Sequence, residues 1–149
     1  SSNVDYEINI TQISGDNIIN TTMINDIKRI SKPNSKKKFK IKIDTNYEKK
    51  VVSKNIKGSA SDYQLIATVN IEIVENDYVE SFTYQEKQNI KKSLDSFDQI
   101  NYENTIKENF ATSFVRKLNL VWLFKTKPLP ILLFFPSVII FSPPLAILM

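Results

Sequence analysis

The sequence predicts an α+β fold in which two helices pack on one face of a four-stranded mixed sheet. Four segments show strand-type alternation and two carry apolar residues at helical spacing, in the order β-α-β-β-β-α. In the strands, polar or lysine-bearing positions lie opposite the apolar ones. One face of the sheet is therefore expected to be covered by the helices and the other to meet solvent.

The first strand is predicted in VDYEINITQI, residues 4–13, where Tyr6, Ile8 and Ile10 alternate with polar side chains. A helix is predicted next, because Gly15 and Asp16 supply turn and N-cap chemistry and Pro33 stops the helical pattern. Its apolar stripe comprises Ile19, Met23, Ile24, Ile27 and Ile30. This stripe is expected to face the core, since a helix this short needs tertiary packing to form.

A lysine-rich strand is predicted in KKKFKIKID, residues 36–44. Phe39, Ile41 and Ile43 form one face, and Lys38, Lys40 and Lys42 form the other. The pattern beyond Asp44 leaves open whether the strand continues or ends near residues 51 and 52.

The clearest strand is YQLIATVNIEIV, residues 63–74, with an apolar or aromatic residue at every odd position. The polar turn at residues 75–77 leads into YVESFTYQ, residues 78–85, so the two segments are predicted to form an antiparallel hairpin at the centre of the sheet. After a polar link, a second amphipathic helix is predicted in residues 101–118. Its stripe comprises Tyr102, Ile106, Phe110, Phe114, Val115 and Leu118.

The amino-acid composition excludes the commonest types of catalytic site. The chain has no cysteine and no histidine, so it offers no disulfide, thiolate nucleophile, zinc cluster or imidazole base. The carboxylate pairs Asp95 with Asp98 and Glu72 with Glu75 lack a supporting ligand set, and they are interpreted as surface residues. The sequence therefore predicts neither an active site, nor a metal site, nor a cofactor, and the protein is not expected to be an enzyme.

The candidate binding site is the row of Lys38, Lys40 and Lys42, because ammonium groups two residues apart on a strand project from one face toward anionic phosphates. The simpler interpretation is a solvated face, or lysines that keep an exposed strand from pairing with other chains. Nucleic acid is a rival partner for a basic surface near the aromatic side chains of Tyr63, Phe82 and Tyr84. Those three share the phase of the apolar residues and are expected in the core, so no nucleic-acid binding is expected.

The last part of the chain differs in composition from the rest. Residues 120–149 are rich in Phe, Leu, Ile and Pro, and no Asn, Asp, Glu or Gln occurs after Asn119. We predict one α+β domain in residues 1–119, followed by a hydrophobic tail that is foreign to it, as a shifted reading frame would produce. The alternative is a C-terminal membrane anchor, since residues 129–149 are uncharged and long enough to cross a bilayer. Interior prolines oppose a helical span.

Several phrases resemble the lipopolysaccharide-assembly lipoprotein family of Gram-negative outer membranes (LptE), over about residues 4–118. They are the opening strand, the GDNIIN step into the first helix, YQLIATVNIEI, the aromatic FTYQ strand, and SFDQINYENTIKENFATSFVRKL closing on a helix. The resemblance implies a non-enzymatic role inside the lumen of an outer-membrane β-barrel translocon (LptD-like), with lipopolysaccharide as ligand. It also implies a periplasmic location, with an N-terminal lipid anchor on a cysteine upstream of Ser1. The alternative function is a C-terminally anchored small α+β domain of unknown ligand.

Overall fold

A computed structural model of the chain describes residues 5–126, and side chains to residue 122. The chain divides into two compact units, residues 1–117 and 118–149, and the whole sheet and the first helix belong to the first unit. Residues 127–149 of the predicted tail lie outside the described residues, whereas residues 120–126 belong to a helix that begins at Ser96. Both the foreign origin of the tail and its role as an anchor stay predictions. Within the described part, neither helix combines the length and hydrophobicity that a bilayer-spanning helix needs.

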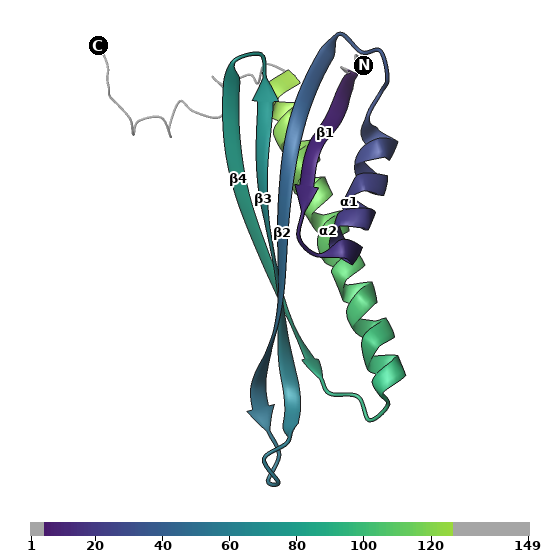
Figure 1. Cartoon of the computed structure of the whole chain (residues 1–149), viewed down its shortest axis with the longest axis vertical. Helices are drawn as coiled ribbons and strands as arrows, with labels where there is room; N and C mark the ends of the chain where they lie inside the picture. The colour runs from purple at the N-terminus through teal and green to yellow at the C-terminus, as the bar shows by residue number, and fades with distance from the viewer. Residues whose placement is uncertain (1–4, 127–149) are drawn as a thin grey trace, which may run out of the picture. The chain divides into compact units, whose positions relative to one another are not determined.

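The predicted element order is confirmed (Figure 1). Strand β1 spans Tyr6–Ser14, helix α1 spans Asn17–Ile30, and strand β2 spans Lys37–Lys54. Strands β3 and β4 span Ala60–Glu75 and Tyr78–Lys91, and helix α2 spans Ser96–Thr126. The sheet order is β1-β2-β3-β4, in which β1 pairs parallel with β2 and the other neighbours are antiparallel.

The sheet is therefore mixed, as predicted, but the expected central pair is only half right. Strand β3 is central, whereas β4 lies at an edge, because β2 takes the place on the other side of β3. The extent of β2, which the sequence left open, is now defined, since this strand continues through residues 51 and 52 to Lys54. Strand β4 likewise continues to Lys91, into what the sequence suggested was a polar link.

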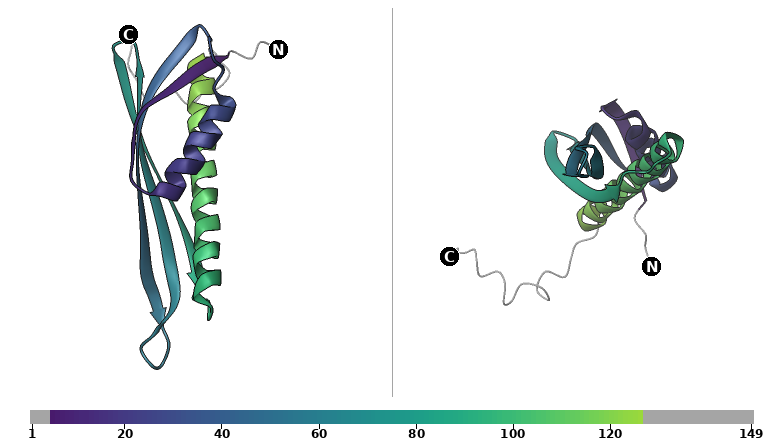
Figure 2. Two further views of the ribbon diagram at one scale, coloured as in Figure 1. Left: turned by 45° about the vertical axis from the view of Figure 1, so that its right-hand side comes forward. Right: turned by 90° about the horizontal axis from the view of Figure 1, so that it is seen from below.

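Both helices lie on the same side of the sheet in the first unit (Figure 2). The predicted stripe of α1 is buried at Ile19, Met23 and Ile27. Facing strands contribute the predicted alternating positions, with Phe39, Ile41 and Ile43 in β2 and five side chains in β3: Leu65, Ala67, Val69, Ile71 and Ile73. Full burial of each large apolar side chain stabilises the fold by about 1.5–3 kcal/mol. These residues form the core that holds the sheet and helices together.

The turn from β1 into α1 depends on Gly15. This residue has φ of 104°, and a Cβ atom there would lie 1.8 Å from the backbone oxygen of Thr45 in β2. Only glycine fits both the left-handed backbone and the close approach. Asp16 then caps α1 as predicted, with its side chain accepting hydrogen bonds from the backbone N–H groups of Ile18 and Ile19.

Helix α2 differs from its prediction at both ends. It begins at Ser96, before the predicted start at residue 101, and it continues beyond residue 118 to Thr126. Tyr102, expected in the buried stripe, is 51% exposed, whereas Ile106, Phe110 and Phe114 are buried as predicted. A strict spacing of four drifts around a helix with 3.6 residues per turn, so Tyr102 lies well away from the face that Phe114 presents.

Candidate functional site

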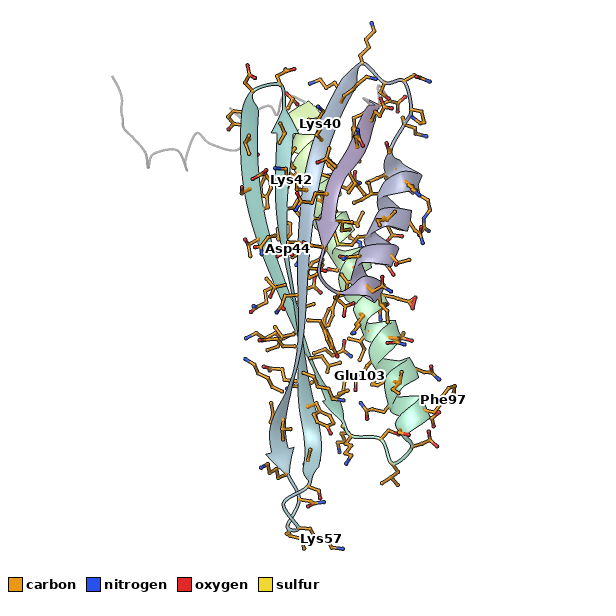
Figure 3. All side chains as sticks on the ribbon, in the orientation of Figure 1. Lys40, Lys42, Asp44, Lys57, Phe97 and Glu103 are labelled. Atoms are coloured by element: carbon orange, nitrogen blue, oxygen red, sulfur yellow. The ribbon has the colours of Figure 1, made fainter. Side chains whose placement is uncertain are left out.

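The predicted lysine row lies on the helix-free face of the sheet. Lys38, Lys40 and Lys42 are all exposed, and each alternates in β2 with a buried apolar residue that faces the helices. Figure 3 labels Lys40, Lys42 and Asp44 along this strand. Side chains two residues apart on one strand project at intervals of about 6.5–7 Å. The structure thus brings the three predicted residues into one row.

Two of the three lysines have carboxylate partners on the neighbouring strands. Lys38 donates a hydrogen bond to Glu7 of β1 at 2.8 Å, and this bond lowers the pKa of Glu7. The Lys42 ammonium lies 3.3 Å from the carboxylate of Glu72 in β3. Lys40 has no ion pair with any residue in the described part of the chain. Lys40 is therefore the cation of the row that is available to an external anion without breaking an existing pair.

A shallow hollow of about 340 Å³ adjoins the row. It lies across β1, β2, β3 and β4, and most of its polar lining consists of hydroxyl, amide and carboxylate groups: Gln12, Ser14, Asp44, Asn70, Glu72 and Thr83. Lys42 also lines it, at the end nearest Lys40. Hydroxyl and amide groups are suited to hydrogen bonding with sugars and phosphate oxygens. The hollow and the lysine row together form a candidate surface for a phosphorylated, polyhydroxylated ligand, here called the lysine face.

The sequence did not reveal a second polar cluster, which lies between the sheet and α2. The carboxylate of Glu103 in α2 pairs with the Lys49 ammonium, and it accepts hydrogen bonds from Tyr47 Oη at 3.2 Å and Gln99 Nε2 at 2.8 Å. Burial acts to raise the pKa of Glu103, but the hydrogen bonds from Lys49 and Gln99 outweigh it and lower the pKa. Burial, together with the Glu103 charge, raises the pKa of Tyr47.

A neighbouring pair extends this cluster to α1. Lys107 of α2 lies 2.8 Å from the Asp16 carboxylate and 4.1 Å from the centre of the Tyr47 ring. Each charged group of the cluster is matched by a partner of opposite sign. These contacts tie α2 to β2 and to the start of α1. The apolar period of the helix does not indicate this cluster, because Gln99 and Glu103 are polar residues at inward-facing helix positions.

The other residues considered in the sequence have structural or surface positions. Tyr63, Phe82 and Tyr84 are half-buried on the helix-facing side, and the rings of Phe82 and Tyr84 stack with centroids 6.4 Å apart. Asp95 caps the start of α2 through the N–H groups of Phe97 and Asp98. Among the described residues, no group of acidic side chains is arranged to hold a metal ion.

Comparisons with known proteins support the fold. No protein-family model matches the sequence, and no curated protein matches it. Among solved structures, rare lipoprotein B from Shewanella oneidensis is similar, with a TM-score of 0.57 and 9% identity over 78% of this chain and 100% of that one. A protein described as a lipoprotein of Caulobacter crescentus CB15 has a TM-score of 0.53 and 13% identity over 80% and 93% of the two chains. At such identities the likeness shows that this chain has the fold of these bacterial lipoproteins.

Proposed function

We propose that this protein is a non-enzymatic component of outer-membrane lipopolysaccharide assembly that binds lipopolysaccharide on the lysine face. The observation that carries the proposal is the row of lysines on the helix-free face, in which Lys40 is not committed to a carboxylate. Ammonium groups bind phosphate as point charges, and the adjoining hydroxyl and amide groups suit the sugar portion of such a ligand.

The fold supports the same role. Rare lipoprotein B from Shewanella oneidensis has the same fold, and the sequence of residues 4–118 resembles the lipopolysaccharide-assembly lipoprotein family. A polar sheet face is also compatible with the polar interior of a large outer-membrane barrel. We therefore propose an LptD-like β-barrel translocon as the protein partner. We place the chain at the periplasmic side of the outer membrane, held by a lipid anchor upstream of Ser1.

Lipopolysaccharide binding to the full chain tests the proposal. Replacing Lys38, Lys40 and Lys42 together with Gln removes three charges at nearly constant side-chain length, and the affinity is expected to fall at least about tenfold, as losing about 1.4 kcal/mol does. The corresponding Glu variant should bind still more weakly. Changing Lys28, Lys32 and Arg116 to Gln removes the same charge from exposed positions outside the row and serves as the control.

Circular dichroism should show the same fold in all variants. Unchanged binding by the Gln variant, or an equal loss in the control, would remove the assignment of lipopolysaccharide to the lysine face. The barrel partnership is tested separately by co-expression with an LptD-like barrel, and failure to form a stable complex would count against it.

A further inference from the structure

One end of the sheet presents apolar side chains to solvent in two separate turn regions. The first is the end of the β2-β3 hairpin, and the second is the β4-α2 link with the first turn of α2. Figure 3 labels Lys57 in the first and Phe97 in the second. Ile56 and Leu94 are fully exposed, and Phe97 is 70% exposed. The full set is Val51, Val52, Ile56, Leu94, Phe97 and Ile100. Single exposed apolar residues are ordinary, but six of them in two regions at one end make this end a candidate for an interaction surface.

The hairpin part of this end is basic. Residues 49–59 include four lysines and no acidic residue. The second region carries both charges, since Lys91 and Lys92 end β4 and begin the following link, whereas Asp95 and Asp98 lie beside Leu94 and Phe97. The backbone N–H of Lys92 donates to the Ser61 oxygen at 2.8 Å, so this link lies beside the start of β3, next to the hairpin turn. Lys54, Lys57, Lys91 and Lys92 have no ion pair within the described part of the chain. Apolar and cationic groups are therefore exposed together.

Hydrogen bonds within the hairpin turn pair the backbone N–H groups of four of its residues. Asn55 Oδ1 accepts from the N–H groups of Lys57 and Ser59 at 2.9 and 3.0 Å. The Gly58 N–H donates to the Asn55 oxygen at 2.9 Å, and the Asn55 N–H donates to the Ser59 oxygen at 2.8 Å. Unpaired backbone groups are the main cost of moving a turn out of water. These four bonds lower the cost of bringing Ile56 to an apolar boundary.

We propose that this basic apolar end docks on the headgroup region of an anionic phospholipid bilayer, with Ile56 reaching the acyl boundary and the four lysines contacting lipid phosphates. We choose an anionic bilayer as the partner because of its charge. The lysines that surround Ile56 would face the anionic headgroups, and Ile56 would face the apolar acyl chains below them. The opposite end of β3 provides a contrast. Its turn exposes Tyr78 and Val79, but it is flanked by Glu75, Asp77 and Glu80. The inference does not depend on the lysine face.

The absence of cysteine from the chain allows a site-specific test. Ile56→Cys in the full chain is labelled with the environment-sensitive fluorophore NBD, and Val79→Cys provides the matched control at the acidic end. Each is mixed with vesicles of phosphatidylcholine alone or of phosphatidylcholine with phosphatidylglycerol. The probe at position 56 is expected to shift to the blue and brighten severalfold with the anionic vesicles only. The probe at position 79 should not change.

Charge variants complete the test. In the labelled chain, changing Lys54 and Lys57 to Glu should weaken vesicle partitioning by an order of magnitude or more. Changing Lys28 and Arg116 to Glu should leave partitioning unaltered. A probe at position 56 that stays in water while the chain sediments with vesicles would overturn the proposal, since another segment then holds the membrane. A response to lipopolysaccharide without one to phospholipid, or a concentration-dependent response without vesicles, would also overturn it, in favour of lipopolysaccharide or a second copy of the chain.

Discussion

The Lys107 ammonium lies 2.8 Å from the Asp16 carboxylate, which also accepts hydrogen bonds from the first N–H groups of α1. One carboxylate therefore caps one helix and holds the other. Both side chains are largely buried, at 16% and 14% exposure, so water screens the pair little. Burial acts to raise the pKa of Asp16, but the N–H groups and Lys107 outweigh this effect and lower the pKa.

Asp16→Ala is expected to lower the free energy of unfolding by about 2–4 kcal/mol, because it removes a cap and leaves Lys107 without its counter-charge. Asp16→Asn keeps the cap and should cost about half as much. Asp95→Ala is the control, since Asp95 is an exposed cap of α2 and should cost about 1 kcal/mol. Urea denaturation measures all three. Equal losses for Asp16→Ala and Asp95→Ala would mean that the ion pair adds nothing.

The two glycines differ in what an added methyl group would meet. Gly15→Ala should cost at least about 3 kcal/mol, because the Cβ atom collides with the Thr45 backbone and the φ angle is also unfavourable. Gly58→Ala shares the positive φ but meets nothing within 4 Å, so it should cost only about 1–2 kcal/mol. Thermal unfolding of the two variants separates the steric contribution. Similar melting temperatures would show that β2 moves freely away from residue 15.

Glu103 should make the free energy of unfolding depend on pH in the acidic range. Its pKa is lowered in the folded protein, so its contribution is complete above the unfolded value of about 4.3 and disappears as the pH falls through the folded value. Glu103→Gln is expected to cost about 1–3 kcal/mol at pH 7. Wild type and variant should converge as the pH falls through the lowered pKa of Glu103 in the folded protein. Glu48→Gln, in an exposed pair with Lys50, should change stability by less than about 0.5 kcal/mol at either pH. A pH-independent difference at position 103 would indicate lost packing rather than lost charge.

Thr45 is a polar residue in an otherwise apolar row. It is 3% exposed, its Oγ1 accepts from the Asp16 N–H at 2.9 Å, and it donates to Asn20 at 2.7 Å. Thr45→Val keeps the shape but leaves these groups unpaired, so a loss of about 2–3 kcal/mol is expected. Thr83→Val removes a hydrogen bond to Asn70 on the exposed face and should cost less than about 1 kcal/mol. Chemical denaturation of both variants checks the difference, and a neutral Thr45→Val would show that water replaces the lost bonds.

The parts of the fold that alternation predicted are those where burial is one-sided. The buried apolar side chains in residues 63–74 and 36–44 keep a period of two because one face packs on the helices. Ile66, at an even position of β3, is an exception and is buried as well. The end of β2 was left open because its residues from Glu48 onward are exposed on both faces, so nothing imposes a period. The sequence did not predict the start of α2, because Gln99 and Glu103 occupy its inward-facing positions. Both residues are polar, so they do not contribute to the apolar pattern from which a helix is predicted.

The lysine face could be predicted only in part. The period of two places Lys38, Lys40 and Lys42 in one row, but it does not show that Glu7 and Glu72 neutralise two of them. Those carboxylates come from strands 31 and 30 residues away in sequence, and their approach depends on register. The parallel register of β1 on β2 includes a shift between Ile10 and Gln12, which no local pattern in the sequence indicates.

The parallel pairing of β1 ends at Asp44, so the rest of β2 has a described partner on one side only. The ladder is also interrupted between Val51 and Ser53 and again before Lys54. Strand β4 ends at Lys91 opposite Asp62, so only β2 and β3 continue past that point, and β2 buries no side chain from Glu48 onward. Local opening of this hairpin end therefore costs far less free energy than global unfolding. Amide protons in residues 54–60 should exchange with solvent well before those of the core, while the helices and the lysine face stay folded.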